Sequence, residues 1–343
     1  MKTCCKFPFE NVIIETGGYV YCCCSAYNNH YCIGNIFENT FEEMWYGDKA
    51  IEFRKSILDK SYKYCALGKC TQFCKFDKEN LSEKEIETLL KPPYPKQIHL
   101  SYPSSCNAKC IICRDNIICE TKEETENFNK LNDKIIDICK NADIIHTNDG
   151  GEFLTSPHSK NLIKKLTDKY PHLKFNLKTN GLLCNEKNIK EMGLEDKINN
   201  ISISIHAATK DTYEKIVRGG KWETLIKNLE YLKSLNIKET NFNFVIHSLN
   251  YEEMPAFVKM ANKYNATALF WRMDNWSHSK MSYDFNIYTC WKPWHSDYKN
   301  FLKILNKLKR MKGYILLEAF LRNLQSQTKN PWYIKILHIF KKD

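Results

Sequence analysis

The chain has 343 residues, of which 43% are apolar and 27% charged, and its formal net charge is +11. This composition is typical of a globular protein and excludes a wholly disordered or collagen-like chain. The positive charge is compatible with an anionic ligand or a basic face, but by itself it indicates neither nucleic-acid nor membrane binding. No uncharged apolar stretch of about 20 residues occurs, and the start, MKTCCKFPFE, lacks the apolar run of a signal peptide. We therefore expect a cytoplasmic protein with no transmembrane segment and no nucleic-acid partner.

Residues 1–91 predict a small, irregular amino-terminal domain. A hairpin is expected around the pair Gly17–Gly18. A helix is predicted to begin near Thr40, because Thr40 and Glu43 have the spacing of a capping box and an apolar stripe follows. A second short helix is expected over 82–90.

A domain boundary is predicted at residues 92–96, where Pro92, Pro93 and Pro95 cannot continue a helix and favour an extended linker. We expect a core domain over 97–285 and a helical extension over 286–343. The apolar tail at 330–343 is interpreted either as a helix packed on the core or as a segment lying on an anionic membrane surface.

Strand-like and helix-like segments alternate after the linker. The predicted strands are 97–102, 143–148, 173–180, 200–206, 241–247 and 267–272. Strands that alternate with helices favour a parallel sheet. The expected fold is therefore α/β, a partial (β/α)6 TIM-like barrel with a small irregular amino-terminal domain.

Several of the predicted strands have one polar face. In the fourth strand, for example, Ile201 and Ile203 alternate with Ser202 and Ser204. We expect the apolar faces to meet the helices and the polar faces to line a cavity. The alternative is an antiparallel sheet with one face in water.

Sixteen cysteines are present, and most of them fall into two groups. Nine precede residue 75, and three more form the tight motif Cys106-x3-Cys110-x2-Cys113, directly after the first strand of the core. Without an export signal, metal or redox chemistry is favoured over disulfides. Three close thiolates can bind three irons of a [4Fe–4S] cluster and leave the fourth iron open to another ligand. The alternative is a zinc site that uses Cys119 as its fourth ligand.

This cysteine motif resembles the signature of the radical S-adenosylmethionine (radical SAM) enzymes. Three later segments agree with that family in order, namely NDGGE (148–152), KTNG (178–181) and SISIHAATKDTYEKIVRGG (202–220). The resemblance covers about residues 97–272. It implies an enzyme that reduces SAM at a [4Fe–4S] cluster, giving methionine and a 5′-deoxyadenosyl radical.

The resemblance also implies the roles of individual residues. Cys106, Cys110 and Cys113 would hold the SAM cluster, the 150–152 backbone would bind the SAM amino group, and Arg218 would meet its carboxylate. The full set expected to bind the cofactor is Gly150, Gly151, Glu152, Asn180, Ser202, Ser204, His206 and Arg218. In two departures from the family, Ile112 replaces a usual aromatic residue and His206 replaces an aspartate common in the ribose region.

The amino-terminal cysteines resemble the SPASM domain, which holds auxiliary [4Fe–4S] clusters in many radical SAM enzymes and usually follows the barrel. The pattern Cys5-x12-Gly18-x4-Cys23 opens the segment, and Cys65-x4-Cys70-x3-Cys74 closes it. At least one auxiliary cluster is implied. Its expected ligands are Cys5, Cys23, Cys70 and Cys74, with Cys65 as an alternate. Cys4 competes with Cys5, and Cys22 or Cys24 with Cys23, and a zinc ribbon is the alternative type of site.

Candidate catalytic groups are His206, His247, Cys184 and Cys290. Together with His146, the two histidines lie at the carboxyl ends of predicted strands, where a neutral imidazole can act as a base or have a purely structural role. The lone thiols Cys184 and Cys290 are read either as hydrogen-atom donors, as in some relatives, or as small buried hydrophobes.

The resemblance implies a reductant such as flavodoxin or ferredoxin, and a peptide, carbohydrate or other small molecule as substrate. SPASM-type relatives modify ribosomal peptides, mature sulfatases, or oxidise small alcohols and sugars. Two other classes of function stay open. The chain could be a non-catalytic iron–sulfur electron carrier or scaffold, or a zinc-binding interaction protein.

Overall fold

The computed structural model describes residues 5–24, 28, 30–66, 70, 82–101, 105–147, 150–275 and 284–327. The chain divides into two compact units. The first comprises Met1–Ser105, Cys119–Leu177 and Glu191–Ile198, and the second Cys106–Ile118, Lys178–Lys190 and Asn199–Asp343. Predictions for Cys4, Cys74 and the tail at 330–343 lie outside the described residues.

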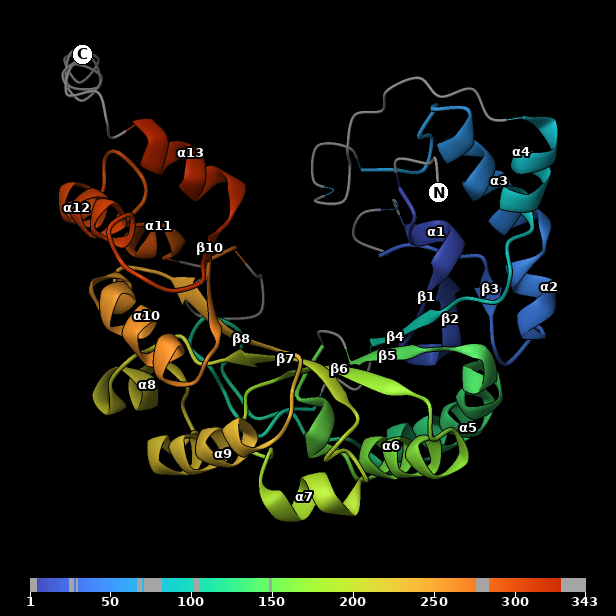
Figure 1. Cartoon of the computed structure of the whole chain (residues 1–343), viewed down its shortest axis with the longest axis horizontal. Helices are drawn as coiled ribbons and strands as arrows, with labels where there is room; N and C mark the ends of the chain where they lie inside the picture. The colour runs from blue at the N-terminus through green and yellow to red at the C-terminus, as the bar shows by residue number, and fades with distance from the viewer. Residues whose placement is uncertain are drawn as a thin grey trace. The chain divides into compact units, whose positions relative to one another are not determined.

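The first unit is built on a sheet in the order β6-β5-β4-β1-β2-β3 (Figure 1). Its strands are β1 (Asn11–Glu15), β2 (Tyr19–Tyr21), β3 (Gly34–Asn35), β4 (Gln97–Ser101), β5 (Ile144–Thr147) and β6 (Lys174–Thr179). Strands β4, β5 and β6 are parallel neighbours, which confirms the first three strands predicted for the core. The β1–β2 pair is antiparallel, which confirms the hairpin around Gly17–Gly18. Strand β1 also extends the sheet by pairing in parallel with β4, which the sequence pattern does not predict.

Helices α5 (Lys122–Ile138) and α6 (Pro157–Lys169) pack side by side against the apolar face of this sheet (Figure 1). On this face the side chains of Ile98, Ile145 and Phe175 are buried, each at most 1% exposed. Apolar and polar residues alternate along these strands, so that each strand has one apolar face. The hydrophobic effect favours the strand conformation here because it lets the helices cover that face.

The remaining helices of the first unit are α1 (Phe7–Glu10), α2 (Phe41–Trp45), α3 (Asp48–Leu58) and α4 (Glu83–Leu90). The capping box of Thr40 and Glu43 at the start of α2 is confirmed, as is the helix expected over 82–90. A second capping box, of Ser82 and Glu85, begins α4. Each of the two boxes satisfies two backbone N–H groups that a helix start leaves without intrahelical partners.

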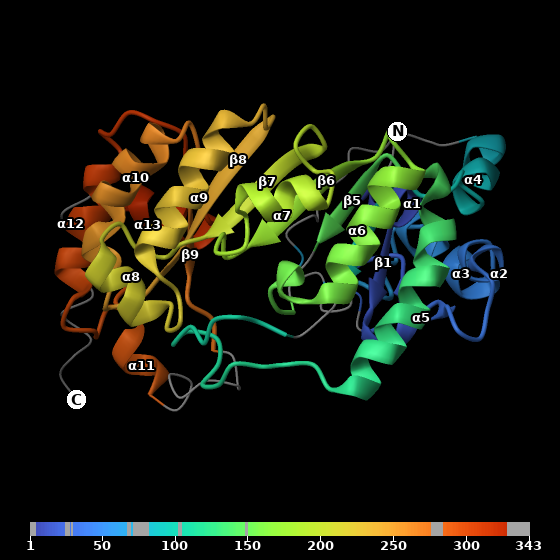
Figure 2. The ribbon, with the colours of Figure 1, turned by 90° about the horizontal axis from the view of Figure 1, so that it is seen from below.

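The second unit has a sheet in the order β10-β9-β8-β7; Figure 2 labels its strands β7, β8 and β9. Its strands are β7 (Ile198–Ser204), β8 (Glu239–Ile246), β9 (Thr267–Arg272) and β10 (Ile315–Leu317), and its helices are α7 (Glu186–Glu191), α8 (Lys210–Ile216), α9 (Trp222–Ser234), α10 (Met254–Lys263), α11 (Phe285–Tyr288), α12 (Tyr298–Leu308) and α13 (Ala319–Gln327). These strands are parallel, so the remaining three strand predictions are confirmed and the antiparallel alternative is wrong. Aromatic contacts of Phe257 on α10 with Phe242, Phe244 and Phe270 form the core of this unit.

The chain thus has the mostly parallel α/β architecture expected of a partial (β/α)6 barrel with an amino-terminal addition. Within the described ranges, no helix is both long and apolar enough to cross a bilayer.

Candidate functional site

The cysteine motif lies on a loop of the second unit that is closed by its own backbone. Cys106 pairs with Ile118 in an isolated bridge, with its N–H donating to the Ile118 oxygen at 3.0 Å. The N–H groups of Lys109 and Ile111 donate at 2.9 Å to the carbonyls of Arg218 and Ile216. Two backbone hydrogen bonds therefore fasten the middle of the loop to the last residue of α8 and to the segment that follows it.

The three thiols of this loop are close enough to influence one another. Burial, together with the neighbouring Cys106 and Cys113, raises the pKa of the Cys110 thiol to about 12. Arg114 hydrogen-bonds to Cys113. Three thiolates so close together require a compensating cation, which bound metal supplies. Three thiols that each bind a different iron fit the donor chemistry of a [4Fe–4S] cluster. The described residues contain no group of three or more His, Cys, Asp or Glu side chains placed to hold a single metal ion.

Asn180 and Arg218 lie against the same loop. The Asn180 amide nitrogen donates to Asn107 Oδ1 at 2.8 Å and lies 4.0 Å from Cys106 Sγ. The Arg218 Nε donates to the carbonyl oxygen of Lys109 at 3.1 Å. The guanidinium also lies 3.7 Å from an Asp115 carboxylate oxygen. Both residues assigned to SAM by resemblance therefore contact the cysteine loop.

Residues Gly150–Glu152 belong to the first unit, and Asn148 and Asp149 before them lie outside the described residues. The Glu152 side chain is buried, and its Oε1 accepts from the Leu154 N–H at 3.4 Å. The Glu152 N–H donates to the carbonyl oxygen of Ser105 at 2.8 Å. The segment expected to bind the SAM amino group is thus hydrogen-bonded to Ser105, which directly precedes Cys106.

The polar face of β7 carries the predicted ribose region. Ser202 Oγ accepts from the Asn243 side chain at 2.6 Å, and Asn243 Oδ1 accepts from the Trp271 indole at 3.3 Å. Ser204 is half-buried, and His206 is buried with φ of 64°, a left-handed backbone conformation uncommon outside glycine. His206 Nδ1 accepts the Val245 N–H at 3.1 Å, which fixes the neutral ring with its proton on Nε2.

A second group of neighbouring cysteines lies in the first unit. Burial raises the pKa of the Cys23 thiol well above its usual range, and Cys5, Cys70, Cys65 and Cys24 raise it further. Four of the five predicted auxiliary ligands therefore lie together, and Cys24 is the additional neighbour.

The other nearby amino-terminal thiols have different surroundings. Cys22 is completely buried beside Arg54, where burial raises its pKa to about 11 and Arg54 opposes the rise. The Cys32 Sγ donates to the carbonyl oxygens of Val20 and Gly34 at 3.4 and 3.1 Å.

Two family models match the chain. The model of the radical SAM superfamily matches residues 100–261, and the model of the SPASM iron–sulfur cluster-binding domain matches residues 4–71. The chain therefore contains a radical SAM domain in the region after its proline-rich linker. Its SPASM domain precedes the radical SAM region, in the order expected from the cysteines. The radical SAM domain implies a SAM-binding [4Fe–4S] cluster and SAM itself, and the SPASM domain implies auxiliary iron–sulfur binding.

Individual similarities are distant. A probable GTP 3′,8-cyclase of Methanococcus maripaludis is 25% identical over 178 residues, which are 50% of this chain and 56% of the relative. A GTP 3′,8-cyclase of Clostridium perfringens is 24% identical over 183 residues, 51% of this chain and 55% of the relative. The chain thus spans about half the length of these curated relatives. The crystal structure of Streptococcus suis SuiB has a TM-score of 0.44 at 13% identity, covering 79% of this chain and 62% of that one.

The candidate catalytic groups of this radical SAM protein are all buried. His247, Cys184 and Cys290 are completely inaccessible. His247 Nδ1 accepts the Leu249 N–H at 3.2 Å, while its Nε2 has no hydrogen-bond partner within the described part of the chain. Cys184 Sγ lies 3.6 Å from Thr179 Oγ1. These positions favour the structural alternative for the two thiols.

His146 lies on β5, where its ring stacks on His99 with the ring centroids 4.0 Å apart. Its Nε2 lies 2.8 Å from Gln97 Oε1. Burial, together with the neighbouring His99, lowers the pKa of His146 to about 3. The imidazole is therefore neutral at physiological pH and engaged within the sheet.

Sequence reasoning missed several polar residues of the site. A buried network joins Ser105, Glu120, Ser156 and His158, and the Ser105 carbonyl oxygen accepts the Glu152 N–H. Asn107 was missed as the partner of Asn180. The sequence signal for Ser105 and Asn107 is their position beside Cys106. No local pattern links Glu120 to Ser156 and His158, which lie 36 and 38 positions later in the chain.

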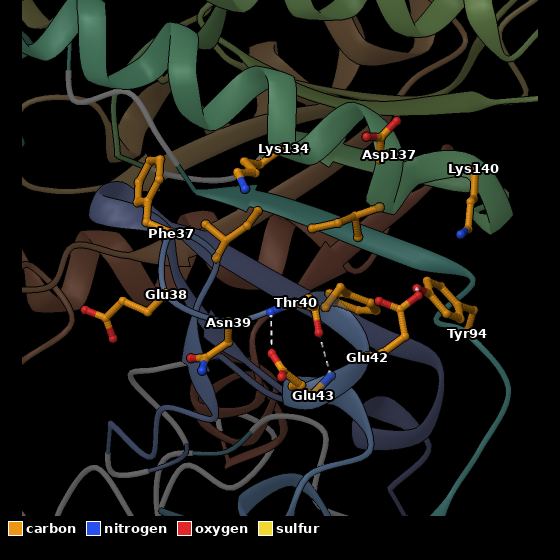
Figure 3. A pocket seen from close by; sticks show the side chains of 13 residues that line it. Phe37, Glu38, Asn39, Thr40, Glu42, Glu43, Tyr94, Lys134, Asp137 and Lys140 are labelled. Atoms are coloured by element: carbon orange, nitrogen blue, oxygen red, sulfur yellow. Dashed lines mark hydrogen bonds between the residues drawn. The ribbon is translucent and has the colours of Figure 1, made fainter.

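A separate pocket of about 410 Å³ lies in the first unit, between the segment around α2 and the carboxyl-terminal half of α5 (Figure 3). Its polar groups are largely engaged with one another. Glu43 is held in the capping box with Thr40, and Glu42 accepts a hydrogen bond from Tyr94. None of the predicted SAM or cluster residues lines this pocket.

Proposed function

We propose that this protein is a radical SAM enzyme that cleaves SAM reductively and uses the resulting 5′-deoxyadenosyl radical to abstract hydrogen from its substrate. The observation that carries the proposal is the attachment of the Cys106–Cys113 loop to Asn180 and Arg218, described above. A non-catalytic cluster carrier has no need for a cysteine loop tied to residues of a SAM site.

In this proposal the chain's own residues bind and orient SAM. Cys106, Cys110 and Cys113 hold the cluster, which supplies the electron for cleavage when SAM is bound. Backbone groups of residues 150–152 accept the SAM amino group, and Arg218 offers its guanidinium to the carboxylate. Ser202, Ser204 and Asn180 supply further polar contacts.

We assign His206 and His247 to the support of the turns after β7 and β8, because each accepts a backbone N–H through Nδ1. In this proposal none of the buried candidates acts on the substrate as a hydrogen donor or base. These candidates are His206, His247, Cys184 and Cys290.

The proposed substrate is a peptide, a carbohydrate or another small molecule. GTP belongs in the first substrate panel because two curated relatives are named GTP 3′,8-cyclases. The proposed partner is a one-electron reductant such as flavodoxin or ferredoxin. The proposed auxiliary ligands are Cys5, Cys23, Cys65, Cys70 and Cys74, and the cluster they hold would pass electrons or contact substrate.

The test is anaerobic reconstitution with iron and sulfide, reduction with dithionite and addition of SAM, followed by chromatography for 5′-deoxyadenosine. The matched control replaces Cys106, Cys110 and Cys113 together with alanine. We expect 5′-deoxyadenosine from the wild type and none from the control. A reducible, fully loaded protein that makes none with any panel substrate would favour the non-catalytic carrier, and a protein that loads zinc but not iron would contradict the proposal.

A further inference from the structure

A buried carboxylate in the first unit joins three other polar side chains. Glu120 Oε1 accepts from the Ser105 hydroxyl at 2.7 Å. Its Oε2 accepts from the Ser156 hydroxyl at 2.9 Å and lies 3.1 Å from His158 Nδ1. The side chain of Glu120 is only 8% exposed and that of His158 only 1%. A carboxylate in such surroundings is stable only when its oxygens are hydrogen-bonded, as they are here.

The far side of this network is anchored to α5. The His158 ring stacks on Phe128 with the centroids 4.5 Å apart. The His158 carbonyl oxygen accepts from the Asn132 side chain at 3.0 Å. Glu120 therefore meets a partner whose position is fixed by two contacts with the neighbouring helix.

The near side of the network is Ser105, at the base of the cluster loop. The chain leaves the first unit after Ser105 and returns at Cys119, so that the hydrogen bond from Ser105 to Glu120 joins the two ends of the loop. The carbonyl oxygen of Ser105 also accepts the Glu152 N–H at 2.8 Å. One serine thus connects Glu120 to the segment expected to bind the SAM amino group.

We propose that Glu120 is a positioning residue for SAM, which through Ser105 fixes the base of the cluster loop and the backbone of residues 150–152. The inference rests on the proposed function, since it assigns the 150–152 segment to the SAM amino group. Glu120 touches neither SAM nor the cluster in this account. Its contribution is to restrict the positions available to a backbone that SAM binding would otherwise have to order.

Two variants interrupt the network at different points. Glu120→Gln keeps the size of the side chain but replaces one acceptor oxygen with an NH2 donor, which cannot accept from the hydroxyl it faces. Ser105→Ala removes the hydroxyl and leaves the backbone intact. The matched control is Ser159→Ala on α6, because Ser159 is fully buried and its hydroxyl has no hydrogen-bond partner among the described residues.

The experiment measures hydrogen–deuterium exchange at the Glu152 amide in the reconstituted protein without SAM, and then the dissociation constant of SAM from the change in the cluster's electron paramagnetic resonance spectrum. We expect faster exchange at Glu152 and roughly five- to tenfold weaker SAM binding in both network variants, with unchanged iron content. Ser159→Ala should match the wild type in both measurements.

Unchanged exchange at Glu152 in both variants would overturn the inference, as would equal losses in the Ser159→Ala control, which would indicate a general packing defect. Failure of the proposed function has a different signature. A wild type that binds no SAM contradicts the function, whereas the exchange rate at Glu152 tests the Glu120 contact without SAM.

Discussion

Arg218 donates from Nε to the carbonyl oxygen of Lys109, 3.1 Å away, while the Lys109 N–H donates back to the Arg218 carbonyl at 2.9 Å. This reciprocal pair joins residues 109 positions apart in the chain. An arginine assigned to the SAM carboxylate is thereby also a support of the loop that carries the three cluster cysteines.

We expect Arg218→Ala to weaken SAM binding about tenfold, equivalent to roughly 1.4 kcal/mol. The magnitude lies at the low end for a charge-assisted hydrogen bond because the Arg218 side chain is 39% exposed. Calorimetric titration of the reconstituted protein with SAM measures the effect. Arg322→Ala, at an exposed site on α13, is the matched control. Equal SAM affinity in the Arg218 and Arg322 variants would refute the supporting role.

Adjacent cysteines in the first unit should differ in their effect on auxiliary iron. Cys23 lies with Cys5, Cys65 and Cys70, whereas Cys22 is fully buried beside Arg54. We expect Cys23→Ala to lose one auxiliary cluster, about four irons per chain. Cys22→Ala should keep that iron. Iron and sulfide analysis after anaerobic reconstitution distinguishes the two, and loss of iron in the Cys22 variant alone would reverse the assignment.

Arg54 holds four helices of the amino-terminal domain together. Its guanidinium is buried and donates to the carbonyl oxygens of Pro8, Trp45 and Leu90 at 3.0, 2.7 and 3.1 Å. Arg54→Met keeps the aliphatic volume but leaves these three carbonyls without their donor. We expect a loss of about 2–4 kcal/mol in the free energy of unfolding, measured with urea.

The control for this substitution is Lys55→Met, the exposed neighbour on α3. It should change the free energy of unfolding by less than about 0.5 kcal/mol. If the Arg54 variant is as stable as this control, the guanidinium contributes only packing volume.

The protein should lose stability in mild acid through His247. Burial, together with the neighbouring His206, lowers the pKa of His247 to about 3, whereas an unfolded imidazole has a pKa of about 6.5. Below about pH 6.5 the unfolded state therefore binds the additional proton, and this residue reduces the free energy of unfolding by up to about 1.4 kcal/mol per pH unit. The stabilising contribution is fully present above pH 6.5.

Urea unfolding of the wild type and His247→Gln between pH 7.5 and 4.5 measures this effect. The variant should have a shallower slope below pH 6.5 and a parallel profile above it. Identical slopes below pH 6.5 would mean that the native state accommodates the charged imidazole.

The SAM region was more predictable than its supporting contacts. The cysteine spacing, the 150–152 segment and the strand alternation are local patterns, so their positions on the chain could be read directly. The partner of each side chain could not, because Ser156 lies 36 residues from Glu120 and Asn107 lies 73 residues from Asn180. A hydrogen bond between distant residues leaves no periodic signal in the sequence.

The sequence by itself determined the alternation of strands and helices, the capping box at Thr40, the short helix over 82–90, and the two groups of cysteines. These features depend on neighbours within a few residues, through backbone propensity, helix capping and the hydrophobic period. Tertiary structure alone decided that β1 pairs with β4, that Cys22 is buried beside Arg54 while Cys23 lies with Cys5, Cys65 and Cys70, and that Glu120 connects Ser105 to His158. Each of these outcomes depends on which buried polar groups meet once the sheet has brought distant segments together, because a buried donor or acceptor must find a partner wherever the fold supplies one.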